Sequence, residues 1–181
     1  PNVRHTKQSL PHRPKTTAPA NNTDPNTGPN SHIVGASGEL QNANQVLSAE
    51  QLKRLEQARK TFDKPVLIVS QEEATRNEAN KPSGKKTWIF KADNVRDFAF
   101  ATSRKFIWDA MNVELNGKKI MAMSFYPKEA NPLWGQYSTM LVAHTVKTYS
   151  KFTFDYPYPV AQSVHGPVGR SDLGPDDCQH G

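Results

Sequence analysis

The amino-acid sequence predicts an α+β fold that combines antiparallel strands with one long helix and a strand after it. Residues 106–126 contain two apolar runs on either side of Asn116-Gly117, the dipeptide that most strongly indicates a β-hairpin. Within residues 133–152, apolar side chains recur at spacings of three and four, which predicts a helix of roughly five turns. Strands and a single long helix in separate stretches are typical of an α+β fold.

Composition and charge narrow the classes of function. Of the 181 residues, 35% are hydrophobic, and the formal net charge is +6. Residues 1–28 carry +3, residues 170–181 carry −2, and the residues between them carry +5, with Lys and Arg interspersed among acids. This distribution indicates a solvated surface and not a nucleic-acid partner. No apolar run reaches the ~20 residues that cross a membrane. The single cysteine, Cys178, excludes an internal disulfide and a thiolate metal site.

The first segment, residues 1–28, is predicted to be a disordered basic tail. It contains five prolines, and its apolar residues are only Val3, Leu10, Ala18 and Ala20. Such a segment cannot bury enough apolar surface to offset its conformational entropy. An alternative, a basic arm that binds nucleic acid, predicts salt-dependent DNA binding that is lost when residues 1–28 are deleted.

Residues 29–84 are predicted to alternate short strands with a surface helix. His32–Ala36 reads as a strand closed by small residues, and Pro65–Ser70 reads as a strand from its β-branched residues. Between them, Ser48-Ala-Glu-Gln51 has the pattern of a capping box, so we expect a helix from there to about Lys60. Glu72–Asn77 adds one helical turn in a polar stretch.

The next strands carry the predicted core. Lys85–Ala92 and Asp97–Thr102 alternate apolar and polar residues and are expected to be joined by a turn at Asp93-Asn94, in a sheet that is packed on both faces. After them, the hairpin of residues 106–126 places three side chains on one face as core filling, namely Met121, Met123 and Phe125.

The long helix is expected to begin with Asn131 as its N-cap residue and Pro132 at its first position. The spacing predicts one apolar stripe that must pack on something, formed by Trp134, Tyr137, Leu141, Val142, Val146, Tyr149 and Phe152. Pro157 and Pro159 then forbid helix, and Val160–His165 is predicted to be a strand.

Two stretches resemble a known family. The run Lys-Thr-Tyr-Ser-Lys-Phe-Thr-Phe-Asp-Tyr-Pro-Tyr-Pro of residues 147–159, with the strand and Gly-Pro-Val-Gly after it, resembles the opening of the catalytic domain in zinc aminopeptidases of the aminopeptidase N and leukotriene hydrolase type, which are gluzincin metallopeptidases. Residues 85–106 resemble the last strands of that family's N-terminal β-domain.

The resemblance implies two partial domains. Residues 29–130 are expected to be the last antiparallel strands of a β-saddle N-terminal domain. Residues 131–169 are expected to be the first helix and strand of a thermolysin-like catalytic domain, and residues 170–181 a non-homologous tail. The chain is therefore expected to be a fragment of a peptide-cleaving enzyme.

The same resemblance supplies the candidate site. In the family, a Gly-x-Met-Glu-Asn loop binds the amino end of the substrate, and its first position falls on Gly169. Ser171, Asp172 and Leu173 stand in place of Met, Glu and Asn, so only Asp172 keeps a carboxylate. Substrate contacts are thus expected from Gly169 and Asp172.

No catalytic residue and no metal ligand is predicted in the chain. The family's zinc motif, H-E-x-x-H, would lie further on, and no histidine in this sequence precedes a glutamate. No two histidines are four residues apart, so structural roles are expected for His32, His144 and His165. Zinc is accordingly expected as a cofactor of the parent family and not of this chain.

A second reading is a stand-alone β-rich protein-interaction module. Its core would be the aromatic residues Trp88, Phe90, Phe98 and Phe100, and an exposed helix would be its binding surface. A single cooperative unfolding transition of residues 29–169 favours this reading, whereas a fragment exposes apolar surface and binds hydrophobic dye.

Overall fold

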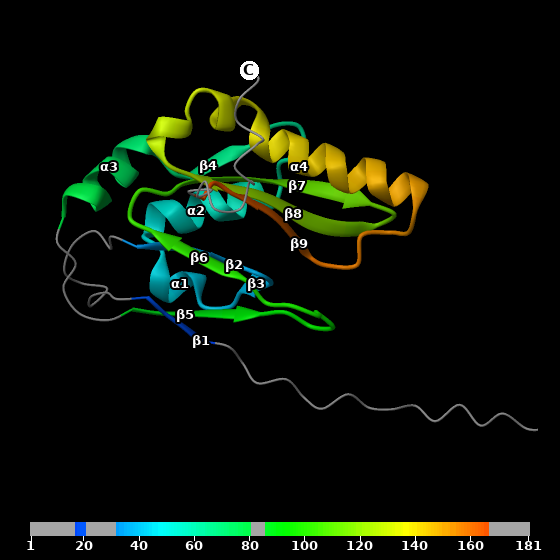
Figure 1. Cartoon of the computed structure of the whole chain (residues 1–181), viewed down its shortest axis with the longest axis horizontal. Coiled ribbons are helices and arrows are strands. Elements are labelled where there is room, and N and C mark those ends of the chain that lie inside the picture. The colour runs from blue at the N-terminus through cyan, green and yellow to red at the C-terminus, as the bar shows by residue number, and fades with distance from the viewer. Residues whose placement is uncertain (1–16, 21–31, 81–85, 167–181) are drawn as a thin grey trace, which may run out of the picture.

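The largest sheet organises the molecule. The computed structural model describes residues 17–20, 32–80 and 86–166. Their fold is a mixed α+β arrangement, which confirms the predicted class (Figure 1). The largest sheet has the order β4-β7-β8-β9, and helix α4 lies across one of its faces (Figure 1). The bounds of these elements are Val66–Val69 for β4, Ile107–Leu115 for β7, Lys118–Tyr126 for β8, Leu133–Phe152 for α4 and Val160–Val164 for β9.

Strands β7 and β8 form the hairpin that the sequence predicts. They pair antiparallel from Ile107 opposite Tyr126 to Leu115 opposite Lys118. Asn116 and Gly117 take positive φ angles of 48° and 77°, as a tight two-residue turn requires. Strand β9 runs parallel to β8, and α4 makes the crossover that a parallel pair needs.

Two smaller sheets lie beside the large one (Figure 1). One has the order β1-β5-β3, and the other is the pair β2-β6. Their bounds are Thr17–Ala20 for β1, Ile33–Ala36 for β2, Glu39–Leu40 for β3, Lys86–Lys91 for β5 and Phe100–Ser103 for β6. The turn between β2 and β3 depends on Gly38, whose φ is +99° and whose Cβ, if it had one, would collide with the Lys91 carbonyl.

The smaller sheets correct two expectations. Thr17–Ala20 is a strand paired with β5, so the prediction of disorder is wrong for these four residues, and the rest of residues 1–28 lies outside the described part. Backbone hydrogen bonds between paired strands form whatever the side chains are. A prediction from apolar content alone therefore misses such a strand. Strand β6 begins only at Phe100 and pairs with β2, so the turn at Asp93-Asn94 does not join a hairpin.

The predicted two-sided packing holds for only some of the aromatic residues. Trp88 and Phe90 are buried in β5, with their rings stacked 6.3 Å apart. Phe98 packs against the core from a loop, whereas Phe100 is 55% exposed. Alternation alone did not show which face of β6 the neighbouring layer would cover.

Capping residues set the starts of the short helices. Helix α2 (Ala49–Ala58) begins at the predicted capping box, in which Ser48 Oγ accepts a hydrogen bond from Gln51 N at 3.2 Å. Helix α3 (Gln71–Ala79) is longer than the single turn expected, and it begins at a second box formed by Ser70 and Glu73. The four-residue helix α1 (Ala43–Val46) and the 3₁₀ turn η1 (Lys128–Ala130) were not predicted. Within the described ranges, no helix is long and apolar enough to cross a membrane.

Helix α4 differs from its prediction at its start and in its packed face. Pro132, not Asn131, is the N-cap residue, although Asn131 Oδ1 still accepts a hydrogen bond from Gly135 N at 3.2 Å. The side chains buried against the sheet are those of Thr139, Ala143 and Val146. Most of the predicted apolar stripe is exposed, namely Tyr137, Leu141, Tyr149 and Phe152. Small side chains let the helix approach the sheet closely. The periodicity does not show which of the two apolar faces of the helix packs on the sheet.

The four-stranded sheet is packed on both faces, as alternate residues of its strands show. One face carries Trp108, Met121 and Phe125 into a core shared with β2, β5 and α2. The other face carries Met111, Val113, Ile120 and Ala122 beneath α4. Met121 and Phe125 are thus confirmed as core residues, and Met123 packs against the same cluster. The layers are close, since a Cβ on Gly35 would lie 3.0 Å from the Phe125 ring.

Candidate functional site

A buried polar cluster fixes α4 to the sheet. The Asp109 side chain on β7 accepts a hydrogen bond from the Tyr126 hydroxyl at 2.6 Å and another from the Thr139 hydroxyl of α4. Ser124 Oγ on β8 lies 2.7 Å from Thr139 Oγ1 and 2.9 Å from Ser138 Oγ. These contacts join two strands and the helix through four hydrogen bonds. They determine where α4 lies over the sheet.

The Asp109 carboxyl is buried and holds α4 to the sheet. Burial raises the pKa of Asp109 above its ordinary value, and the two hydrogen bonds from Thr139 and Tyr126 only partly oppose this effect. Burial and the neighbouring Asp109 raise the pKa of the Tyr126 phenol. Asp109 lines neither of the two hollows described below.

The Tyr-Pro corner connects α4 to β9. Ser150 Oγ on the last turn of the helix accepts a hydrogen bond from Tyr156 N at 3.0 Å. The Tyr156 hydroxyl donates to the Val160 carbonyl at 3.0 Å, and the Tyr158 ring meets the Tyr156 ring edge to face with centroids 5.6 Å apart. Burial raises the pKa of Tyr156. The corner therefore fixes the direction in which β9 leaves the helix.

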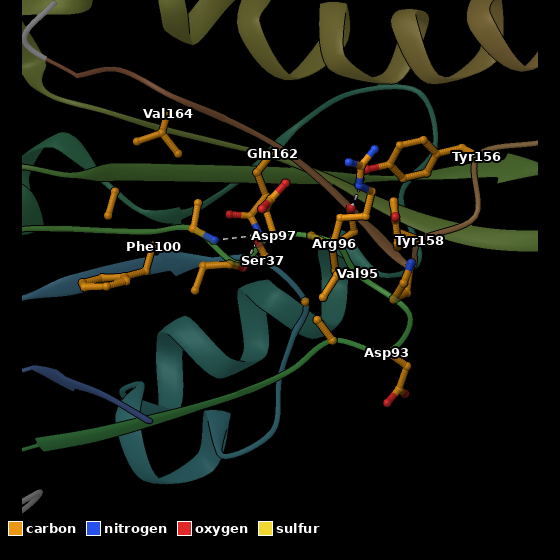
Figure 2. Close-up of a pocket in the computed structure, with 18 residues that line it drawn as sticks. Ser37, Asp93, Val95, Arg96, Asp97, Phe100, Tyr156, Tyr158, Gln162 and Val164 are labelled. Carbon is orange, nitrogen blue, oxygen red and sulfur yellow. Dashed lines mark hydrogen bonds between the residues drawn. The ribbon is translucent and has the colours of Figure 1, made fainter. Parts of the chain in front are cut away.

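One hollow lies between β9 and the loop that joins β5 to β6 (Figure 2). We call it the Tyr158 hollow; its volume is 630 Å³, and its aromatic and charged lining is Tyr156, Tyr158, Phe100, Asp93, Arg96 and Asp97. The Gln162 side chain crosses beside it, since its Nε2 donates to the Ala36 carbonyl of β2 at 2.6 Å. The hollow thus combines aromatic rings with charges of both signs.

A second hollow of 680 Å³ lies between α4 and β9. We call it the α4 groove; its apolar lining includes Leu133, Trp134, Tyr137, Leu141, Val142 and Ala161, and no charged side chain lines it. Leu133, Tyr137 and Leu141 are 64%, 53% and 60% exposed. Much of the exposed apolar surface of the helix therefore gathers beside β9.

Strand β9 separates the two hollows. Val160 and Val164 line the Tyr158 hollow, whereas Ala161 and Ser163 line the α4 groove. Among the described residues, only β8 pairs with β9, so the other edge of β9 has no strand beside it. The hollows and this edge form one continuous candidate site, which sequence patterns did not indicate because its parts come from distant segments.

The residues predicted to contact substrate lie outside the described part of the chain. Gly169 and Asp172 both fall in residues 167–181. The described histidines have separate surroundings: His32 lies 3.3 Å from the Thr102 hydroxyl, His144 lies near Thr148 on α4, and His165 packs against the Trp134 ring. Burial, and then the charge of Arg104, lower the pKa of His32.

Within residues 17–20, 32–80 and 86–166, no group of three or more His, Cys, Asp or Glu side chains is placed to hold a metal ion. The described donor set therefore does not fit zinc. Comparisons with protein-family models, with curated proteins and with solved structures each found no match for this chain.

Proposed function

We propose that this chain is scaffold from a zinc-dependent aminopeptidase, a metallopeptidase that cleaves N-terminal residues from peptides. In this proposal, the strands up to β8 are the end of a β-saddle N-terminal domain. Helix α4 and β9 are the beginning of a thermolysin-like catalytic domain, and the chain itself holds no zinc and has no activity.

The observation that carries the proposal is the unit formed by α4, the Tyr-Pro corner and β9. The helix ends at the aromatic residue Phe152, the corner follows over residues 153–159, and the parallel strand β9 comes next. This is the order of elements in the family that residues 147–169 resemble. The exposed apolar side chains of α4 also suit a helix that further parts of a larger enzyme would cover.

The proposal assigns no catalytic step to the described residues. In the family, zinc polarises the scissile carbonyl and activates water, with a glutamate as general base. Because the described side chains do not supply a set of zinc ligands, those roles belong to parts of the parent enzyme that the described residues do not include. What these residues supply is the position of β9, through the anchor at Asp109 and the corner at Tyr156.

The DNA that encodes this chain tests the proposal. We expect one of its three forward frames, read on from the codon of Gly169, to encode Met-Glu-Asn at the second to fourth positions after it and then an H-E-x-x-H motif. If none of the three frames encodes either motif, the assignment to this family is wrong.

The second candidate function is a stand-alone β-rich protein-interaction module. The observation that favours it is a buried core that joins both smaller sheets, α2 and the large sheet around Trp88 and Phe125. Thermal unfolding followed by calorimetry separates the two functions. One cooperative transition without binding of a hydrophobic dye supports the module, whereas dye binding by the native chain supports the scaffold.

A further inference from the structure

We propose that Asn116 is a site of spontaneous deamidation, and that its conversion to aspartate or isoaspartate releases the Tyr-Pro corner from the β7–β8 turn. The reaction takes water as its co-reactant and needs no enzyme. This inference concerns the covalent state of the chain, so it goes beyond the scaffold function and does not depend on it.

Asn116 and Gly117 form an open turn. Both residues are exposed, and Asn116-Gly117 is the single Asn-Gly dipeptide in the 181-residue sequence. Apart from its chain neighbours, no heavy atom lies within 4 Å of the position that a Cβ on Gly117 would take. The glycine thus leaves room for the ring that its peptide nitrogen forms with the Asn116 side chain during deamidation.

Deamidation exchanges the Asn116 amide for a carboxylate. The Gly117 peptide nitrogen loses its proton to solvent and bonds to Cγ of Asn116, while the Cγ–Nδ2 bond breaks and Nδ2 leaves as ammonia with a proton from solvent. Water then opens the succinimide ring. Cleavage of the bond from nitrogen to Cγ gives aspartate, and cleavage of the bond to the backbone carbon gives isoaspartate, whose main chain is longer by a methylene group. Neither step oxidises or reduces the chain.

The Asn116 amide ties the turn to the Tyr-Pro corner. Its Nδ2 donates to Asp155 Oδ1 at 2.8 Å, so the turn and the corner lie side by side (Figure 1). An ionised carboxylate only accepts hydrogen bonds, so either product of deamidation cannot donate to Asp155, and the two carboxylates repel. Lys118 and Lys119, which follow the turn, reduce this repulsion by their charge, but the hydrogen bond is lost.

The hydrogen bond to Asp155 also slows the reaction while it is formed. It directs the amide of Asn116 toward the corner. The side chain must leave Asp155 and turn to the Gly117 nitrogen before the ring can close. We therefore expect deamidation to be faster when Asp155 is replaced by a residue that cannot accept this hydrogen bond.

Asn94 is a matched internal control. It is also exposed, and its φ of 56° is close to the 48° of Asn116. The residue after it is Val95, whose β-branched side chain crowds the peptide nitrogen, whereas glycine does not. A difference in rate between the two asparagines thus reports the Asn-Gly pair and not exposure or backbone conformation alone.

Peptide mapping by mass spectrometry of the full 181-residue chain, incubated at mildly alkaline pH, tests the site. Deamidation adds about 1 Da to the peptide that contains Asn116. We expect this mass gain to be at least about tenfold faster at Asn116 than at Asn94, and Asp155→Ala to accelerate it about threefold or more. Asn116→Gln, whose longer side chain would have to close a larger ring, should abolish it.

Hydrogen–deuterium exchange of residues 153–159 tests the loss of the tie. In Asn116→Asp, which has the deamidated sequence, these amides should exchange at least about threefold faster than in the wild type. The double variant Asn116→Asp with Asp155→Asn places one amide beside one carboxylate again. It should return the exchange rate to that of the wild type.

Three outcomes overturn the inference. The first is a mass gain at Asn116 no faster than at Asn94, since the turn would then not be a preferred site. The second is a rate that Asp155→Ala leaves unchanged or lowers, since Asp155 would then not restrain the amide. The third is exchange that Asn116→Asp leaves unchanged or that stays fast in the double variant, since the hydrogen bond would then not hold the corner.

Discussion

At the scale of single residues, two buried side chains, Asp109 and Lys86, make the stability of the fold depend on pH. The carboxyl of Asp109 is held between strand and helix, and the ammonium of Lys86 is 7% exposed and donates to the Val46 carbonyl at the end of α1. No oppositely charged side chain contributes to the pKa shift of either group. Burial therefore disfavours the charged form of each, with opposite consequences for the pH dependence of folding.

The first prediction concerns Asp109. Because burial raises its pKa in the folded state above the ordinary 3.8, the stabilisation that it contributes is present at acid pH and is lost as pH rises through the folded-state value. Asp109→Asn removes this titration and keeps an amide oxygen that can accept a hydrogen bond. Urea unfolding from pH 4 to 8 should show the variant gaining free energy of unfolding relative to the wild type as pH rises. A difference that stays constant with pH would show that Asp109 does not titrate differently in the two states.

The second prediction concerns Lys86. Burial lowers its pKa from 10.5 to about 8, so between these values the unfolded chain binds more protons than the folded chain, and stability rises with pH. The slope is at most about 1.4 kcal/mol per pH unit. Lys86→Met should remove this rise in urea unfolding between pH 8 and 10.5. Thr87→Val, a substitution of the neighbouring residue on β5 that removes no titrating group, should keep it; loss of the rise in both variants would contradict the assignment.

At the scale of elements, helix starts and turns are set locally, and one ion pair joins two of the helices. Glu73 accepts from Ser70 N at 2.8 Å as part of the α3 capping box. The same carboxylate accepts two hydrogen bonds from Arg54 on α2, at 2.8 and 2.9 Å. Glu73 thus begins one helix and attaches it to another.

The third prediction follows from this double role. Glu73→Gln keeps the shape of the side chain and removes its charge, so it weakens both the box and the pair with Arg54, whose side chain is 21% exposed. We expect the free energy of unfolding to fall by about 1–2 kcal/mol in urea denaturation at pH 7. Glu72→Gln is the matched control on the same turn and should have a much smaller effect. Equal effects of the two substitutions would remove the special role of Glu73.

Local chemistry explains which elements the sequence predicted. The hairpin, the capping box at Ser48 and the strand after the prolines each depend on a few adjacent residues, and all three are present. The box at Ser70 has the same kind of pattern, Ser-x-x-Glu, and this local signal marks the start of α3. The packed face of α4 was not predictable in this way, because its apolar residues cover more than one face and tertiary contacts decide between them.

At the scale of the whole molecule, the candidate site lies where β9, helix α4 and the small sheet β2-β6 meet. The Tyr158 hollow takes residues from β2, the loop after β5 and the corner before β9, whereas the α4 groove takes residues from α4 and β9. No local pattern indicates such a site, because it depends on long-range packing. The predicted substrate contacts at Gly169 and Asp172 remain predictions, since both residues lie outside the described part.

The fourth prediction concerns the proposed scaffold as a whole. Hydrolysis of leucine p-nitroanilide by the purified chain, with zinc added in slight excess, tests the central claim most directly. Because the described residues offer no set of zinc ligands, we expect the rate to equal that of zinc in buffer alone. Hydrolysis above that rate, stopped by a chelator and restored by zinc, would show that the chain holds a catalytic centre and would contradict the account.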